Sequence, residues 1–297
     1  MADFDKGIEM TNTTPGGPQP FRVDHEGPEG SPRLVLVHGL GGSHVNWSAL
    51  APLLARTTRP VALDLAGFGF TLGGRREANV NANAALLTRF LRDEIREPVF
   101  LVGNSMGGMI SVIVAAAHPE LVRGVVLIDP VLPKPRGVTL NPQVRNAFGA
   151  LLIPVLGPRT MAKRQAAVSI RRRVELTLAL CVADFSRLTT EQLEAEVALV
   201  EAREDAADRI TAHVAATRSL VRRVYGGSYK RELAAITRPV LLLHGVHDVI
   251  VPVASADAAA ARFPHWTYHR MDAGHTPQME LPALTTDHIT TWIEELA

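Results

Sequence analysis

The sequence predicts an α/β fold: a doubly wound, mostly parallel sheet with helices on both faces and an all-helical lid inserted into it. Three observations lead to this prediction. The chain of 297 residues is 46% apolar and has a net charge of +1, the composition of a soluble globular protein. Short apolar runs alternate with helical patterns, as in parallel sheets covered by helices. This rhythm stops after Asp129 and resumes near residue 233, so one core with an insertion is favoured over two equal domains.

The elements before the break follow one another regularly. Residues 1–20 are rich in Pro, Gly and polar groups and are predicted to form a mobile tail. Residues 21–23 are expected to form an edge strand, and the apolar, β-branched runs that follow predict strands at 34–38, 61–64, 99–102 and 125–128. Apolar residues spaced by three and four predict helices at 45–55, 81–96 and 106–117, and glycines predict a loop at 66–74.

The insertion is predicted at residues 131–232, between the two parts of the core at 21–130 and 233–297. Its pattern is helical throughout, and Thr189 with Gln192 forms a capping box before Leu193, Val197 and Val200 on one helix face. The α/β rhythm then resumes with strands predicted at 240–244 and 267–271 and helices predicted at 254–262 and 283–295.

The stretch 98–119 contains no charged residue and is long enough to cross a bilayer. Its middle, however, is interrupted by Gly103, Asn104, Ser105, Gly107 and Gly108. We therefore interpret it as a buried strand, a tight turn and a buried helix, with no integral membrane insertion.

Composition limits the partners and the compartment. The 31 Lys and Arg residues balance the 30 Asp and Glu residues, so no basic field for a nucleic acid is expected. One cysteine, Cys181, excludes an internal disulfide and a multi-cysteine zinc site. The N-terminus lacks the apolar core of a secretory signal, which makes the cytoplasm the default location. The expected partner is a small-molecule substrate, and the oligomeric state stays open.

The segment from Gly103 to Gly107 matches the pattern G-x-S-x-G between a predicted strand and a predicted helix. Glycines are needed on both sides because the serine sits in a strained turn close to neighbouring backbone. Ser105 would project its hydroxyl at the carboxyl edge of the sheet, where the N–H groups of the following helix face an incoming oxyanion. The alternative is an ordinary glycine-rich turn with a serine cap.

A nucleophilic serine needs a base and an orienting carboxylate. His275 follows Gly274 after the strand predicted at 267–271, and Asp248 follows the strand predicted at 240–244. The chain order Ser, Asp, His is the one expected of this scaffold. Ser105, Asp248 and His275 are therefore the predicted catalytic residues.

An oxyanion hole needs two backbone donors. His38-Gly39-Leu40-Gly41-Gly42 ends the first long strand, and Gly39 and Gly41 let this loop approach the substrate. The predicted donors are the N–H groups of Leu40 and Met106.

These motifs resemble the α/β-hydrolase family, in its serine-nucleophile esterase branch with a helical lid. The resemblance covers residues 33–297 and rests on His38-Gly39, the loop Asp64-Leu65-Ala66-Gly67-Phe68-Gly69, the turn 103–108, the segment 248–252, and Gly274-His275 with Pro277, Gln278 and Glu280 behind it. It implies a helical lid after the strand that ends at Asp129. The short N-terminal part departs from the family pattern, so the usual leading antiparallel strands are expected to be truncated.

Several residues compete for these roles. Asp129 also ends a strand and rivals Asp248 as the acid. His244, His247 and Asp248 form an H-x-x-H-D pattern, but the two histidines lack the spacing of a helical metal-binding pair, and neither a metal nor any other cofactor is predicted.

Other polar residues are given ordinary structural roles. Residues 171–173 are interpreted as a solvated arginine turn of the lid, His213 as a surface or helix-end histidine, and Cys181 as a buried small hydrophobe.

The leading functional hypothesis is hydrolysis of a carboxylic ester of a small, apolar substrate through an acyl-enzyme. Ser105 argues against relatives that use an aspartate nucleophile to open epoxides or displace halide. The turn 103–108 also looks like that of carbon–carbon bond hydrolases of the meta-cleavage-product type, which remain an alternative. A second alternative is a non-enzymatic ligand receptor on the same fold.

Overall fold

The computed structural model describes residues 13–14, 17–153, 156–206 and 208–296. Its centre is a seven-stranded sheet with the order β3-β5-β4-β6-β7-β8-β9, in which β3 runs antiparallel to β5 and all other neighbours are parallel. The strands are β3 (Arg22–Asp24), β4 (Arg33–Val37), β5 (Arg59–Leu63), β6 (Val99–Asn104), β7 (Val122–Ile128), β8 (Val240–Gly245) and β9 (Thr267–Met271). The predicted doubly wound α/β class is therefore confirmed.

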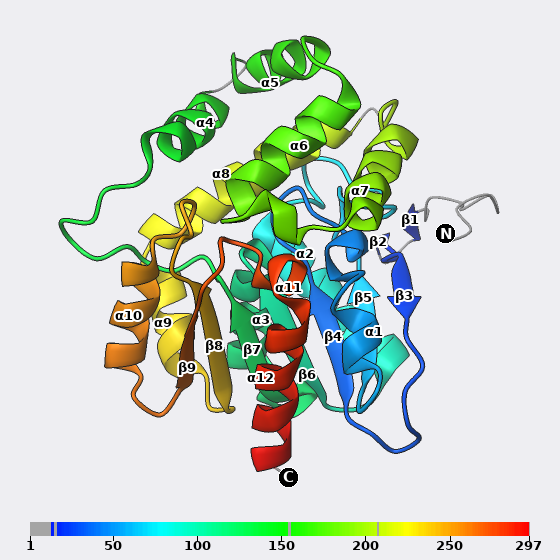
Figure 1. Ribbon diagram of the computed structural model, residues 1–297, viewed down its shortest axis with the longest axis vertical. Coiled ribbons are helices and arrows are strands. Elements are labelled where there is room, and N and C mark those ends of the chain that lie inside the picture. The colour runs from blue at the N-terminus through cyan, green and yellow to red at the C-terminus, as the bar shows by residue number, and fades with distance from the viewer. Residues whose placement is uncertain (1–12, 15–16, 154–155, 207, 297) are drawn as a thin grey trace.

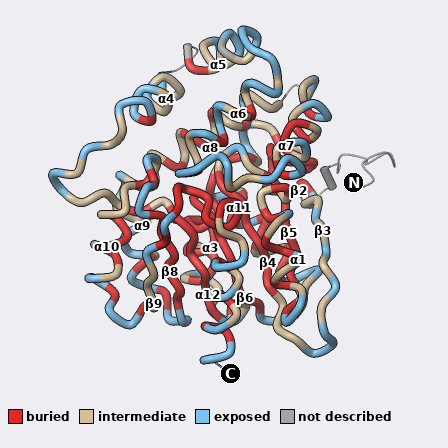
Figure 2. The backbone as a smooth tube through the Cα atoms, viewed as in Figure 1, coloured by how far each residue is buried: buried red, intermediate tan, exposed pale blue. Residues whose placement is uncertain are grey.

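Alternate residues along β4 show how the sheet is covered on both faces. Val35 and Val37 join an apolar cluster with α2 (Val80–Arg89), α3 (Met106–Ala117), α9 (Ser228–Ala235) and α10 (Val253–Arg262). Leu34 and Leu36 join a second cluster with α1 (Ala51–Leu54) and α12 (Pro282–Glu295). The period of two is that of a strand buried on both sides, and Figure 2 shows the buried residues concentrated in the sheet and the helices against it.

Between β7 and β8 the described chain is helical, as predicted. Its helices besides α9 are α4 (Pro142–Leu152), α5 (Leu156–Ala166), α6 (Ile170–Cys181), α7 (Thr190–Ala202) and α8 (Arg209–Tyr225). Figure 1 shows α4, α5, α6 and α7 beyond the carboxyl ends of the parallel strands. The predicted boundary at residue 232 falls inside α9, whose Tyr229 and Leu233 pack into the core cluster.

Three local predictions differ from the structure. The helix expected at 45–55 is split into a 3-10 turn, η1 (His44–Trp47), and α1, because Ser43 and Asn46 form a capping box that starts a separate turn. The helix expected at 81–96 ends as a π-helical turn, η2 (Phe90–Ile95). A short helix after His275, α11 (Pro277–Glu280), is not predicted.

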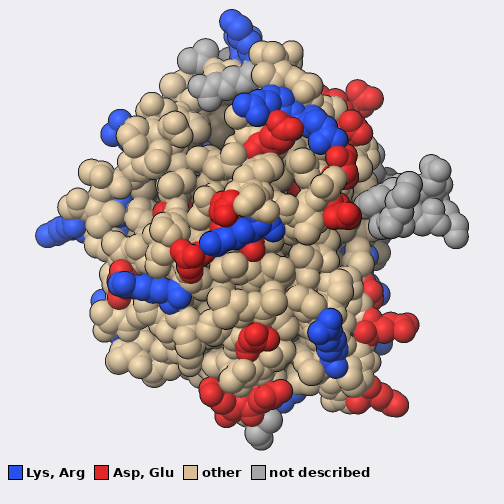
Figure 3. Space-filling model, viewed as in Figure 1, with Lys and Arg blue, Asp and Glu red and all other residues tan. Residues whose placement is uncertain are grey.

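The predicted tail at residues 1–20 lies mostly outside the described residues. Within it, β1 (Thr13–Thr14) and β2 (Gly17–Pro18) pair as an antiparallel two-stranded ladder. Acidic and basic side chains are interspersed over the face of the molecule in Figure 3. Among the described residues, no helix combines the length and the apolar character needed to cross a bilayer.

Candidate active site

Ser105 lies in a sharp turn between β6 and α3. Its backbone angles are φ 53° and ψ −114°, a strained combination for a residue with a side chain. A Cβ on Gly107 would lie 2.0 Å from the carbonyl oxygen of Val37, and one on Gly103 would lie 2.6 Å from the carbonyl oxygen of Gly107. Both positions therefore require glycine, and the predicted strand, turn and helix are present.

His275 and Asp248 meet beside this turn. Nδ1 of His275 lies 2.7 Å from Oδ2 of Asp248, and Oδ1 of Asp248 accepts hydrogen bonds from the N–H groups of Ile250 and Val251. Burial raises the pKa of Asp248, but His275, together with His244 and the N–H of Val251, outweighs burial and holds that pKa below its ordinary value. The imidazole is thus anchored by an ionised carboxylate, and His275 lines the same pocket as Ser105.

The glycine loop after β4 also approaches Ser105. A Cβ on Gly39 would lie 3.1 Å from the Cβ of Ser105, and Gly41 has φ 78°, a left-handed conformation that favours glycine. Among the described residues, the N–H of Leu40 donates no hydrogen bond. The N–H of Met106 belongs to the first turn of α3, where helix donors are unpaired. The structure therefore brings both predicted oxyanion donors close to the turn that holds Ser105.

His38 supports this loop. Its Nδ1 donates to the carbonyl oxygen of Gly39 (2.7 Å), and its Nε2 accepts from the N–H of Leu65 (3.0 Å). Burial lowers the pKa of His38, which keeps the ring neutral for this arrangement.

Asp129, the rival acid, is buried close to His244 and Asp248. Its Oδ1 accepts from the N–H of Gly245 (2.9 Å) and is 3.5 Å from Nε2 of His244. Burial and the negative charge of Asp248 raise the pKa of Asp129 well above its ordinary value. Within the described residues, the only carboxylate bonded to His275 is that of Asp248.

The H-x-x-H-D pattern does not converge as a unit. His247 is exposed and bonds to Asp272, whereas buried His244 lies near Asp129 and Asp248, with ligand atoms within 4.8 Å of one another. His244 already uses Nε2 to donate to the carbonyl oxygen of Val251.

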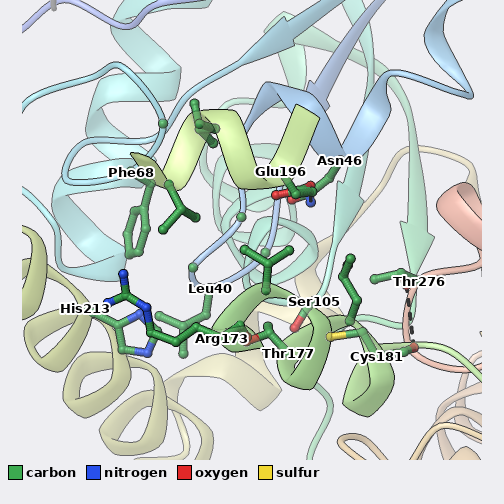
Figure 4. A pocket seen from close by; sticks show the side chains of 18 of the residues that line it. Leu40, Asn46, Phe68, Ser105, Arg173, Thr177, Cys181, Glu196, His213 and Thr276 are labelled. Carbon is green, nitrogen blue, oxygen red and sulfur yellow. Dashed lines mark hydrogen bonds between the residues drawn. The ribbon is translucent and has the colours of Figure 1, made fainter. Parts of the chain in front are cut away.

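Ser105 and His275 open onto a cavity of about 320 Å³ between the sheet edge and helices α6, α7 and α8 (Figure 4). Apolar side chains supply much of its wall, including Val174, Leu178, Leu199, Val200, Ile250 and Met279. Figure 4 shows Phe68 beside His213 at one side of the cavity, and Cys181 and Thr276 on the side of Ser105.

Polar residues of the insertion also line this cavity, and none of them was predicted from the sequence as a site residue. They are Gln165, Arg173, Thr177, Glu196, Arg203, Arg209 and His213, with Asn46 from η1. Two earlier interpretations are wrong in consequence. Arg173 does not belong to a solvated turn, since its side chain is 13% exposed and lines the cavity. His213 is no surface histidine, because it packs over Gly41, and burial lowers its pKa to about 4.

The position of Glu196 in the sequence could have indicated a buried polar site. It lies three residues after Leu193 and four before Val200, on the helix face whose pattern is apolar. A charged residue on such a face indicates a buried polar contact or a site. In the structure, Glu196 accepts a hydrogen bond from Nδ2 of Asn46 (2.6 Å).

Cys181 is partly buried at the end of α6, where it lines the cavity. Its carbonyl oxygen accepts the N–H of His275, and burial raises the pKa of its thiol to about 12. The thiol is therefore protonated at neutral pH, and the backbone carbonyl of Cys181 holds the loop that carries His275.

Comparison with known proteins identifies relatives of this chain. The pimeloyl-[acyl-carrier protein] methyl ester esterase of Aromatoleum aromaticum is 29% identical over 255 residues, covering 84% of this chain and 94% of that protein. The dihydrolipoyllysine-residue acetyltransferase component of the acetoin cleaving system of Cupriavidus necator is 27% identical over 84% of this chain, which spans 60% of that relative's length.

A solved thermophilic esterase from Thermogutta terrifontis has the same fold, with a TM-score of 0.70 and 23% identity over 97% of both chains. A sequence model described as alpha/beta hydrolase fold matches residues 32–282. These matches support a hydrolase. Because the matched region spans most of the chain, the protein belongs to the α/β-hydrolase fold family.

Proposed function

We propose that this protein hydrolyses carboxylic esters of small substrates, with Ser105 as nucleophile, His275 as general base and acid, and Asp248 as the orienting carboxylate. One observation carries the proposal. Ser105 is held in a strained turn at the N-terminus of α3 and faces a cavity that it shares with His275, whose Nδ1 lies 2.7 Å from Asp248. A strained, buried serine beside an anchored imidazole is the arrangement that nucleophilic acyl transfer requires.

In the first half of the reaction, Nε2 of His275 takes the proton of the Ser105 hydroxyl while Oγ forms a bond to the ester carbonyl carbon. The N–H groups of Leu40 and Met106 donate to the resulting oxyanion. The imidazolium, stabilised by Asp248, then gives its proton to the leaving alcohol as the C–O bond breaks. The products are the free alcohol and an acyl group on Ser105.

In the second half, His275 takes a proton from a water molecule, and the hydroxide adds to the acyl carbon. Collapse of this second oxyanion returns the proton to Ser105 and releases the carboxylic acid. One water is consumed for each ester cleaved. The steps use only side chains and backbone of this chain.

We propose that helices α4 to α8 act as a lid over this reaction. They supply most of the cavity wall opposite the sheet edge, including Phe148, Met161 and Leu178. Such a cover excludes bulk water and strengthens the hydrogen bonds to the oxyanion. The apolar part of the wall suits an apolar chain in the substrate.

The test uses p-nitrophenyl esters of increasing acyl length. Ser105→Ala is expected to lower kcat by at least about a thousandfold, because the nucleophile is lost. Ser255→Ala is the matched control: Ser255 is buried on α10, away from the cavity, and this variant should keep wild-type activity. A fluorophosphonate should label Ser105, as read by peptide mass spectrometry, and labelling elsewhere would contradict the mechanism.

The ester panel, together with a thermal-stability measurement and a vinylogous diketone substrate, separates the two alternative functions. A receptor would turn over no ester of any length but would gain thermal stability with a ligand. A carbon–carbon bond hydrolase would cleave a vinylogous diketone faster than any ester in the panel.

A further inference from the structure

The cavity contains a cluster of three arginines from three different helical segments. Arg173 lies on α6, Arg203 follows the end of α7, and Arg209 begins α8, and all three line the cavity. The Arg203 side chain is only 6% exposed. Guanidinium groups this deeply buried are costly unless their charge and their donors are matched.

Ion pairs among the described residues do not match their charge one for one. Glu204 pairs with Arg173 (2.7 Å) and more distantly with Arg209 (3.5 Å), and Asp208 pairs with Arg203 (3.5 Å). The ion pairs of these three cations thus use two carboxylates. Among the described residues, Glu196 is the one acid that lines the cavity, and it is bonded to Asn46 instead.

Their donors are also incompletely used. Nε of Arg173, Arg203 and Arg209 and Nη1 of Arg173 are buried without a hydrogen-bond partner among the described residues. Native proteins leave few buried donors unpaired, and each one asks for an explanation. An Arg guanidinium with a free Nε edge is suited to a carboxylate, which accepts two parallel hydrogen bonds from it.

Helix α6 fixes where this cluster lies relative to the reacting ester. Arg173, Thr177 and Cys181 recur every four residues on its cavity face, and the carbonyl of Cys181 binds the N–H of His275. Figure 4 shows the same order, with Arg173 beside His213 and Thr177 between Arg173 and Ser105. The two turns from Cys181 to Arg173 span roughly 12 Å along the helix axis.

We propose that the natural substrate is an ester bearing a carboxylate at the far end of a short apolar chain, and that Arg173, Arg203 and Arg209 bind this carboxylate. The spacing along α6 leaves room for several methylene groups between the carboxylate and the ester carbonyl, and Val174 and Leu178 line that part of the cavity. This inference rests on the proposed function, because it assumes that an ester carbonyl is placed at Ser105.

The experiment compares monomethyl adipate with methyl hexanoate, which have the same acyl length and differ only in the terminal carboxylate. For the wild type, kcat/KM should be at least about tenfold higher for monomethyl adipate, the contribution expected of charge-assisted hydrogen bonds. Arg173→Met should reduce this ratio towards one. Arg172→Met is the matched control, since Arg172 is exposed on the same helix and pairs with Glu175, and it should keep the wild-type ratio.

A binding measurement keeps the proposal testable if Arg173→Met does not fold. Isothermal titration of the wild type with adipamate should show binding at least about tenfold tighter than with hexanamide. Equal affinities, or equal kcat/KM for the two esters, would overturn the carboxylate proposal while ester hydrolysis itself stood. Tight adipamate binding without hydrolysis of either ester would support the arginine site and contradict the proposed hydrolysis.

Discussion

Glu196 and His213 line the same cavity, but burial shifts their pKa values in opposite directions. Burial raises the pKa of Glu196 to about 7, so its folded form retains a proton that the unfolded chain releases above pH 4.5. Its contribution to stability is therefore complete below pH 4.5 and is lost as the pH rises to 7. Burial lowers the pKa of His213 to about 4, so its contribution is complete above pH 6.5 and is lost as the pH falls through 4.

The pH dependences of stability that Glu196 and His213 contribute have opposite signs. Replacing Glu196 should therefore leave only the pH dependence that His213 contributes. Glu196→Gln keeps an oxygen for Asn46 but cannot ionise, so it should become progressively more stable than the wild type as the pH rises. The difference in unfolding free energy between variant and wild type should grow by roughly 3 kcal/mol between pH 4.5 and 8.

Urea unfolding at several pH values measures this difference. Glu201→Gln, at an exposed position of the same helix, is the control and should show almost no pH-dependent change. A constant difference in unfolding free energy between Glu196→Gln and the wild type at all pH values would show that folding does not raise the pKa of Glu196.

Asp129 and Asp248 can be separated by amide substitutions. We expect Asp248→Asn to lower kcat by roughly 10⁴-fold, because the amide cannot stabilise the imidazolium or hold its tautomer. Asp129→Asn should cost less than about tenfold, since burial and the charge of Asp248 raise the pKa of Asp129 and so oppose its ionisation, and an amide oxygen can still accept from Gly245. Steady-state kinetics on one ester decides between them, and a larger loss for Asp129→Asn than for Asp248→Asn would make Asp129 the essential acid.

At the scale of elements, Glu280 joins the insertion to the loop that carries His275. Its buried carboxylate ends α11 and accepts hydrogen bonds from the N–H groups of Gly274 (2.8 Å), Ala183 (3.0 Å) and Asp184 (3.1 Å). Arg187 adds an ion pair of 3.1 Å. One side chain therefore fixes both the catalytic loop and the segment after α6.

Glu280→Gln should be strongly destabilising for this reason. The amide nitrogen cannot accept, so donors to one of the two oxygens lose their partner, and we expect a loss of about 3 kcal/mol in unfolding free energy. Chemical denaturation measures this loss, with Glu294→Gln at an exposed position of α12 as the control expected to change stability by less than about 0.5 kcal/mol. Equal stability of the two variants would show that Glu280 is dispensable as an anchor.

The same elements show what the sequence could predict and why. Buried strands and the turn that holds Ser105 were predictable because their patterns are local: β6 is apolar from Val99 to Val102, and glycines flank Ser105 where neighbouring backbone approaches. The residues that line the cavity were not predictable from local patterns. Arg171, Arg172 and Arg173 are adjacent in sequence but point about 100° apart around α6. Only the packing of that helix selects Arg173 for the cavity, and no local pattern reports it.

At the scale of the whole molecule, the insertion leaves and re-enters the sheet between two neighbouring strands. β7 and β8 pair directly, from Val125 with Val240 to Ile128 with Leu243. Separation of the outer helices therefore breaks no ladder hydrogen bond of the sheet. Among the described residues of α4, the buried side chain is that of Val144, whereas every residue of β6 and β8 is buried. The two regions should differ in local stability.

Native-state hydrogen exchange tests this difference. Amides of α4 should exchange through local openings well below the free energy of global unfolding, because few apolar contacts oppose them, while β6 and β8 should exchange only on global unfolding. Since Phe148 of α4 and Met161 of α5 line the cavity, such openings would also give a substrate a route to Ser105 without disturbing the sheet that holds it. Protection of α4 equal to that of β6 would mean that the outer helices open only with the core, and entry would then need another path.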